Sequence, residues 1–208
     1  MPTYIRKTKL GLYKTGFYFV HITRLYYLWS VVYQWLYNRK YAKVPVYTMS
    51  PEQATEEVTK LQWRPDGFRE LGDAISSPHW VQYCINEINE GREQPAGSLD
   101  CDDSASWCLK SIDPNFEPLF LLQSWLKRDG EMSGHAVCVF FRGNYPKKIY
   151  HTGNWGIRGP FENVRELSQK MMDAAGGVDP IGWAIYSYDM SLQDFGINIP
   201  PEYNFIDR

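Results

Sequence analysis

The longest apolar and aromatic segment of the chain runs from Gly16 to Tyr37. His21, Arg24 and Gln34 interrupt it, and its tyrosine and tryptophan residues lie in the middle of the segment. A membrane-spanning helix largely excludes charges and keeps these aromatic residues at its two ends. We therefore expect an amphipathic helix that packs on the domain or on a partner. No small-residue cleavage site follows the segment, so we expect no cleavable signal peptide.

Two further helices have clear starting signals. Ser50 is followed by Pro51, and Ser77 is followed by Pro78. A serine N-cap with proline at the first helical position is typical of a helix N-terminus. We expect the first of these helices to end near Leu61.

The second half of the chain alternates apolar runs with turns. Runs of bulky and β-branched residues predict strands at 119–126, 135–141, 148–152 and 181–188, with a loop at 153–160 and an irregular tail from 193. A single apolar stripe predicts a helix at 161–175. This order of elements indicates an α+β fold in which the helix around Cys101 packs on an antiparallel β-meander.

Cys101 lies inside an acidic box, between Asp100 and the pair Asp102 and Asp103. Ser98 or Asp100 can act as the N-cap of a helix that begins here. The backbone N–H groups and the dipole of a helix N-terminus favour a thiolate, as a cysteine nucleophile requires. The carboxylates oppose thiolate formation, so a basic partner must activate the thiol. The ordinary alternative is a buried cysteine that acts as a small apolar residue.

His135 is the candidate basic partner. It opens an apolar, β-branched run directly after a turn that contains Gly134. A cysteine at a helix N-terminus, followed along the chain by a histidine at the head of a strand, is the order found in papain-type thiol enzymes. The oxyanion hole would use the backbone N–H of Cys101 with a donor from Gln94, or from Trp63 or Trp80.

Residues 95–190 resemble the transglutaminase-like cysteine peptidase superfamily. The resemblance rests on three motifs, Asp-Cys-Asp-Asp-Ser-Ala, Gly-His-Ala-Val-Cys-Val and Ile-Tyr-His-Thr-Gly-Asn-Trp-Gly. It implies a papain-like core in which Cys101 and His135 are catalytic. The chain departs from the pattern in two respects: the family's aspartate is absent from its usual spacing, and Asp-Asp follows the cysteine where cell-wall peptidases have Ser-Gly.

The resemblance also bears on metal binding and on origin. In some periplasmic relatives the acids that flank the cysteine bind calcium, which would assign that role to Asp100 and Asp102. Two carboxylates do not make a calcium site by themselves, and helix capping explains them more simply. Small members of the superfamily resemble proteins of tailed bacteriophages, which suggests a virion or assembly role.

The residue that would orient His135 depends on the register of one hairpin. If the turn centres on Gly143 and Asn144, His135 faces Thr152 and Asn154 shares its side of the sheet. If the turn is one residue longer, the parity reverses and His151 faces inward. Asn154 is the favoured candidate, because an amide oxygen can accept the imidazole N–H; His151 stays open.

Composition narrows the remaining choices. The net charge of −2 gives no indication of nucleic-acid binding. The four cysteines lack zinc-type spacing, so we expect reduced thiols, no metal and no cofactor. We expect a basic and aromatic helical extension at 1–49 and one transglutaminase-like domain at 50–208, located in the cytoplasm or in a virion.

Two functions remain. The first is a thiol-dependent amide hydrolase or acyltransferase that acts on a protein or peptide through Cys101, His135 and Asn154 and a thioester. The second is a catalytically inactive structural or adaptor protein that keeps the fold and binds a protein partner through residues 16–40. Membrane contact by this segment is the less favoured interpretation.

Overall fold

The structure is a computed structural model that describes residues 3–64, 75–97, 99–144 and 147–202. Its centre is a six-stranded antiparallel sheet. The strands are β1 (Leu119–Lys127), β2 (Met132–Arg142), β3 (Lys148–Thr152), β4 (Arg158–Phe161), β5 (Gly177–Tyr186) and β6 (Leu192–Ile197). The helices are α1 (Thr3–Ile22), α2 (Leu25–Tyr33), α3 (Pro51–Thr59), α4 (Pro78–Asn89), α5 (Cys101–Ser111) and α6 (Val164–Ala174), with short helical turns η1 (Gln34–Asn38), η2 (Arg39–Tyr41) and η3 (Pro114–Phe116).

The strand order is β4-β3-β2-β1-β5-β6, so β1 and β2 lie in the middle of the sheet. The first four strands form a meander, after which α6 carries the chain back and β5 pairs with the free side of β1. The expected α+β class with antiparallel strands is confirmed. Two details of the prediction were wrong: β4 begins inside the expected loop at 153–160, and β6 occupies residues 193–197 of the expected irregular tail.

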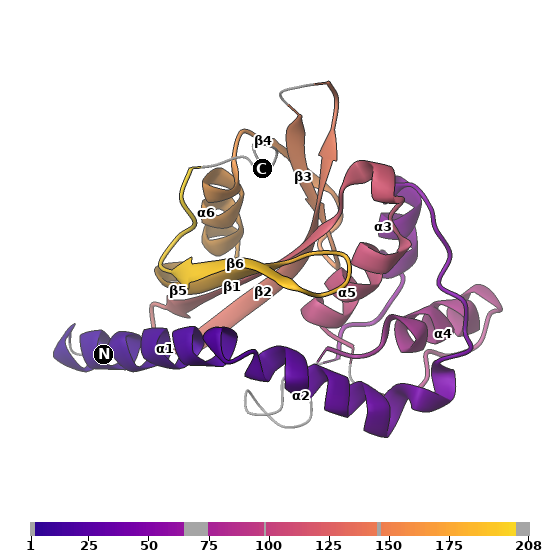
Figure 1. Ribbon diagram of the computed structural model, residues 1–208, viewed down its shortest axis with the longest axis horizontal. Coiled ribbons are helices and arrows are strands. Elements are labelled where there is room, and N and C mark those ends of the chain that lie inside the picture. Colours follow the sequence, from indigo (N-terminus) through magenta and orange to yellow (C-terminus); the bar gives the residue numbers. More distant parts are fainter. Residues whose placement is uncertain (1–2, 65–74, 98, 145–146, 203–208) are drawn as a thin grey trace.

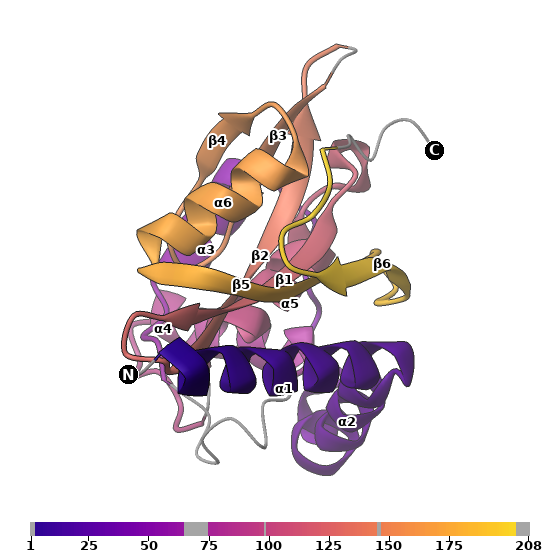
Figure 2. The same cartoon turned by 90° about the vertical axis from the view of Figure 1, so that its left-hand side faces the viewer.

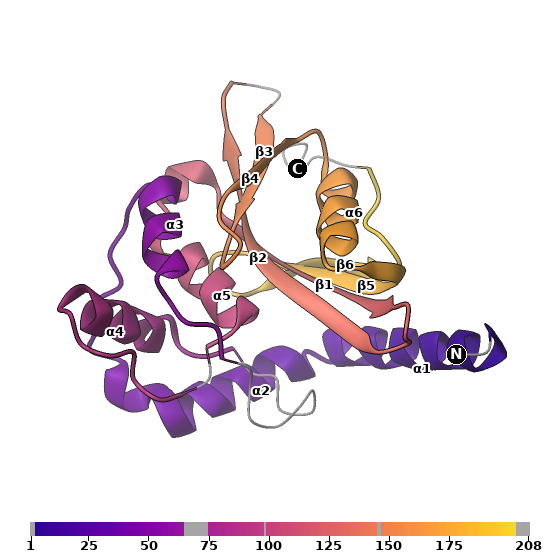
Figure 3. The ribbon, with the colours of Figure 1, turned by 180° about the vertical axis from the view of Figure 1, so that it is seen from behind.

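Both faces of the sheet are covered, as Figures 1 and 3 show. Helices α3 and α5 lie over one face, where their side chains form a core with Ala136, Cys138 and Phe140 of β2. Helix α6 lies over the other face, where its side chains pack on Val137 and Val139. Side chains of a strand point alternately to the two faces, so the residues of β2 from Ala136 to Phe141 belong in turn to one core and to the other.

The expected helix starts are confirmed. The hydroxyl of Ser50 accepts a hydrogen bond from the N–H of Gln53, whose side chain bonds back to the N–H of Ser50. Ser77 caps α4 in the same position, with Pro78 as the first helical residue. A serine cap of this kind stabilises a helix by about 1 kcal/mol.

The N-terminal segment forms an arm, α1 through η2 (residues 3–41), that runs along one edge of the molecule (Figures 1 and 2). The helix begins at Thr3, well before the expected start, and breaks at Arg24, whose φ is 56°. Helix α1 is fastened to β5 and β6. Phe17 packs against Gly182, where a Cβ would lie 2.5 Å from its ring.

Polar side chains of α2 and η1 form hydrogen bonds toward the body of the protein. Spaced four residues apart, Ser30, Gln34 and Asn38 bond to the extended chain at 75–77 that leads into α4. Ser30 accepts from the N–H of Ile75, Gln34 donates to its carbonyl, and Asn38 accepts from the N–H of Ser77 at 2.9 Å. The inner side of this helix is therefore polar.

The opposite side of the arm is apolar and faces outward. We define the outer face of the arm by its exposed side chains: Ile5, Leu12, Phe19 and Ile22 of α1, with Leu25, Leu28, Trp29, Val31, Val32, Trp35 and Leu36 of α2 and η1. A surface helix of a soluble domain normally turns its apolar stripe toward the core. Helix α2 has the reverse arrangement. None of the helices in the described ranges has both the length and the hydropathy of a membrane-spanning segment.

This arrangement predicts opposite effects for neighbouring substitutions. Asn38→Ala leaves the buried N–H of Ser77 without its acceptor, so we expect the free energy of unfolding to fall by about 1–3 kcal/mol. Trp35→Ser, at a side chain that is 61% exposed, should change it by less than about 0.5 kcal/mol. Urea denaturation of the two variants measures both values. Equal destabilisation would show that the outer face belongs to the folded core.

Candidate functional site

Cys101 is the first residue of α5, as the sequence predicted. Asp100 is the N-cap, and its side chain accepts a hydrogen bond from the N–H of Asp102. Asp103 completes a capping box by accepting from the N–H of Asp100 at 3.2 Å. The thiol is partly buried, at the end of the helix where the dipole favours an anion.

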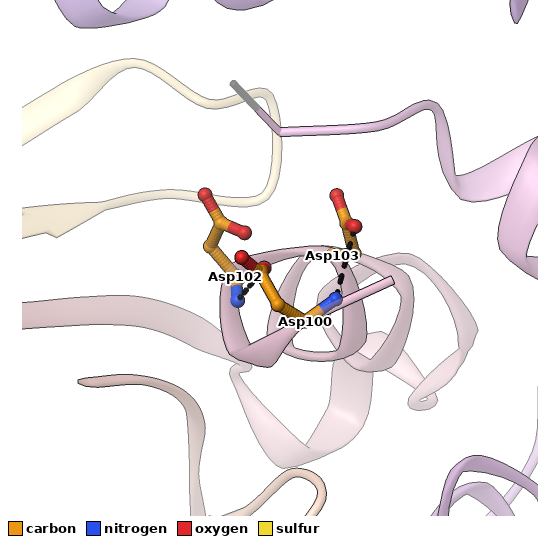
Figure 4. A group of neighbouring side chains, drawn as sticks. All are labelled: Asp100, Asp102 and Asp103. Carbon is orange, nitrogen blue, oxygen red and sulfur yellow. Dashed lines mark hydrogen bonds between the residues drawn. The ribbon is translucent and has the colours of Figure 1, made fainter. Parts of the chain in front are cut away.

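The acidic residues that flank Cys101 connect α5 to its neighbours. Figure 4 shows Asp100, Asp102 and Asp103 at the helix N-terminus. Their carboxylate oxygens lie within 4.8 Å of one another. Asp102 accepts a hydrogen bond from the hydroxyl of Tyr26 in α2, at 2.8 Å. Asp103 accepts from the backbone N–H of Ser76, at 2.5 Å.

These contacts bear on the calcium role that the resemblance suggested. Calcium takes six to eight oxygen ligands and needs open carboxylates. Asp102 and Asp103 are buried, and each already has an oxygen committed to a protein donor. Capping and cross-linking therefore account for the cluster, and we assign no metal to it.

His135 lies on the other side of the sheet from α5. The pairing of β1 with β2 is regular from Leu119 to Leu126 and places His135 opposite Gln123. His135 therefore shares its face with Val137 and Val139, which belong to the core under α6. Ala136 and Cys138, which alternate with these residues along β2, face α5.

The structure therefore does not bring the two predicted catalytic side chains together. A general base must approach the proton that it removes to within about 3 Å, or reach it through one water. Helix α5, which carries Cys101, packs on the face of the sheet formed by the even-numbered residues of β2. His135 lies among the odd-numbered residues, on the opposite face. The backbone of the sheet therefore lies between the two side chains. A shift of one residue in register would have reversed this.

The expected hairpin register was wrong. Arg142 pairs with Lys148, so the connection spans residues 143–147 and is longer than a turn centred on Gly143 and Asn144. Thr152 consequently faces Cys138 and not His135. His151 faces Val139 and lies on the His135 side of the sheet, as the alternative with a longer turn predicted.

Asn154, the favoured third residue, lies beyond the end of β3 in a turn. Its Oδ1 is buried and has no hydrogen-bond partner in the structure. The structure therefore does not place its amide oxygen on a ring N–H of His135.

The environment of His135 is aromatic and dry. Its ring stacks on Trp155, with the ring centroids 3.7 Å apart, and its Nε2 has no hydrogen-bond partner in the part of the chain that the structure describes. Burial, helped by the charge of His151, lowers its pKa to about 3. Burial also lowers the pKa of His151, which stacks on Phe161, to about 4. Both rings are thus neutral near pH 7.

A third buried histidine lies in the arm. The Nδ1 of His21 is 2.7 Å from the hydroxyl of Tyr186 in β5, and burial lowers the pKa of His21 to about 4. Next to it, a pocket of about 170 Å³ lies between the α1–α2 junction and the β5–β6 turn, lined by Arg24, Asp189 and their neighbours. The contact between His21 and Tyr186 joins the arm to the sheet.

The three candidate oxyanion donors, Gln94, Trp63 and Trp80, have surroundings that do not connect them with Cys101. Gln94 exchanges two hydrogen bonds with the backbone of Gln62. Trp80 is buried in a small core with Cys84 and Leu99, whereas Trp63 is exposed. The structure assigns none of the three to the Cys101 site.

Sequence reasoning missed the polar side chains of the arm that form hydrogen bonds to the rest of the protein. Tyr26, Ser30, Gln34 and Asn38 repeat every four residues within an otherwise apolar run. A polar stripe at this spacing marks one face of a helix. This polar stripe could have predicted that the polar face of the helix, and not its apolar face, packs against the rest of the protein.

Substitution of Asp103 tests its structural role. Asp103→Ala removes the acceptor of the buried N–H of Ser76 and half of the capping box, so we expect a loss of about 2 kcal/mol or more in unfolding free energy. The matched control is Asp113→Ala, which removes the N-cap of η3 at an exposed contact and should lower it by about 1 kcal/mol or less. Thermal denaturation of both variants makes the comparison.

The buried histidines predict acid sensitivity. An unfolded histidine has a pKa near about 6.5, above the folded values, so the unfolded state binds more protons and stability falls as pH drops below that value. The effect approaches about 1.4 kcal/mol per pH unit for each histidine. His151→Leu should therefore reduce the slope of unfolding free energy against pH between about 6 and 4.5. An unchanged slope would contradict the burial of His151 as a neutral ring.

Comparison with known proteins identifies no relatives of this chain. No family model matches it, and neither a curated protein nor a solved structure does. The resemblance to the transglutaminase-like cysteine peptidases remains a prediction that rests on the three motifs alone.

Proposed function

We propose that this chain is a binding protein that docks to its partner through the outer face of the arm. The arm is carried by a transglutaminase-like core that does not catalyse hydrolysis through a Cys–His pair. The observation that carries the proposal is the reversed orientation of α2, with hydrogen bonds inside and apolar side chains outside. This is the adaptor function that the sequence left open. A virion or assembly component would fit it.

The size and continuity of the outer face support docking. Trp29 and Leu28 of α2 are 45% and 57% exposed, and Trp35 of the η1 turn that continues α2 is 61% exposed. Large contiguous apolar patches on a folded domain mark interaction sites. Tryptophan is also enriched among the residues that contribute most to binding energy.

The inner contacts support the same interpretation because they fix the arm in place. Tyr26 and Ser30 hold α2 to α5 and to the chain before α4, and the Arg6–Asp179 ion pair, with an N–O distance of 2.6 Å, holds α1 to β5. A face held rigidly on a domain loses little conformational entropy on binding. The outer face is therefore preorganised.

The separation of Cys101 from His135 removes the main support for the hydrolase. Hydrolysis through a thioester needs a base beside the thiol and an orienting group beside that base. His135 faces α6, and its ring is covered by Trp155. A thiol hydrolase remains the second candidate, favoured by the position of Cys101 as the first residue of α5.

Alkylation of Cys101 separates the two candidates. Cys84, Cys108 and Cys138 are buried, and burial raises the pKa of Cys84 to about 12 and raises those of the other two thiols as well. Iodoacetamide on the native protein should therefore report Cys101, and Cys101→Ser should remove the signal. We expect the same dependence of the rate on pH in the wild type and in His135→Gln.

The contrary outcome is defined by the same experiment. If the wild-type profile extends to lower pH and His135→Gln returns it to that of an ordinary thiol, the two side chains form an ion pair and the hydrolase is restored. Circular dichroism of His135→Gln is the control, because the ring is buried and its loss can affect folding.

A further inference from the structure

Charge is distributed unevenly along the chain. Residues 1–49 contain eight lysine and arginine residues and no aspartate or glutamate. The remaining residues contain fourteen basic and all twenty-four acidic residues, a net charge of −10. The near-neutral total thus conceals a basic arm on an acidic body, and such asymmetry indicates an anionic partner for the basic part.

The structure separates the basic residues of the arm into two groups. Arg6 and Lys14 point inward, where they bond to Asp179 and to the side chain of Asn198, each at 2.6 Å. The others are exposed to solvent: Lys7, Lys9, Arg24, Arg39 and Lys40 of the arm, and Lys43 directly after it. The two inward contacts fix α1, so the exposed group is available to a partner.

The exposed basic residues flank the outer face along its length. Lys7 and Lys9 lie in the same helix turns as Ile5 and Leu12, Arg24 lies at the junction of α1 and α2, and Arg39 and Lys40 follow Trp35 and Leu36. The guanidinium of Arg39 is 5.5 Å from the centre of the Trp35 ring. Apolar and cationic side chains thus lie along the same arm, which has no carboxylate of its own, and Asp189 of the β5–β6 turn lines the pocket beside Arg24.

We propose that the outer face of the arm binds the surface of an anionic lipid bilayer. The inference rests on the proposed function and names the partner of the same surface. The arm lies in the membrane plane, its leucine, phenylalanine and tryptophan side chains enter the boundary between headgroups and acyl chains, and its lysine and arginine side chains contact lipid phosphates. The acidic body is repelled by the same surface and points away from it.

Three features favour a bilayer over another occupant. The outer face is broad and apolar, and α1 alone, at 20 residues, extends about 30 Å. Its large side chains include Trp29 and Trp35, and tryptophan concentrates at membrane interfaces. A second copy of this chain would have to present the same basic face to itself in a symmetric dimer, which like charges oppose.

Co-sedimentation of the full chain with lipid vesicles tests the proposal. We expect binding to vesicles of phosphatidylcholine with about 30% phosphatidylserine, at least ten-fold weaker binding to phosphatidylcholine alone, and a similar loss when salt rises from about 0.1 to 0.5 M. Absence of binding to the anionic vesicles, or equal binding to both kinds, overturns the proposal.

Matched variants locate the surface. Trp35→Ser and the double variant Lys7→Glu with Lys9→Glu should each weaken binding to the anionic vesicles by about ten-fold or more. Trp63→Ser and Lys170→Glu are the controls, because Trp63 is as exposed as Trp35, at 57% against 61%, and Lys170 is an exposed lysine of α6. Equal losses in variants and controls would also overturn the proposal.

Two further results distinguish the failure of this inference from that of the proposed function. If vesicles are not bound but sedimentation velocity shows a dimer that Trp35→Ser converts to a monomer, the outer face docks a second copy and only the bilayer is wrong. If acrylamide fails to quench Trp35 in a monomer, measured as the difference between wild type and Trp35→Ser, the face is not exposed and both proposals fail.

Discussion

The alternation of side chains along β2 is the constraint on which the rest of the structure depends. Because both faces of the sheet are covered, the residues of this strand from Ala136 to Phe141 enter one of two cores in alternation. The regular pairing with β1 contains no bulge between Leu119 and Leu126 that would change the parity. Ala136 and Cys138 thereby support α5, and His135 is committed to the side of α6.

The polar groups on the α6 side of the sheet follow from the same constraint. Gln123 is fully buried opposite His135, and neither its amide oxygen nor its amide nitrogen has a hydrogen-bond partner among the described residues. Trp125 Nε1 and Ser168 Oγ are also buried there without partners. Unpaired buried polar groups destabilise a fold by about 1–3 kcal/mol each. The strong apolar packing around α6 must offset them.

Local signals in the sequence were sufficient for most of the elements. The Ser50 and Ser77 caps, the acidic start of α5 at Cys101 and the strands near β1, β2 and β3 are determined by neighbours in the chain, and each was found. β4 and β6 were missed, because they are edge strands whose form depends on pairing with distant residues.

At the candidate site, the sequence alone could predict less. The sequence placed Cys101 correctly, but the position of His135 relative to it depends on parity, and the length of the connection from Arg142 to Lys148 decides which residues of β3 share its side. The orientation of α2 was likewise not decided by its apolar count. It is set by Ser30, Gln34 and Asn38, whose backbone partners near Ile75 cannot be identified without tertiary structure.

The contacts of α1 have a consequence for the order in which the molecule assembles. Lys14 bonds to Asn198, 184 residues away, and His21 bonds to Tyr186, 165 residues away. On a ribosome the arm emerges before the strands that hold it. Contacts this distant in sequence form late in folding. Until β5 and β6 are synthesised, the nascent chain therefore carries a basic, aromatic helix without the strands that will anchor it.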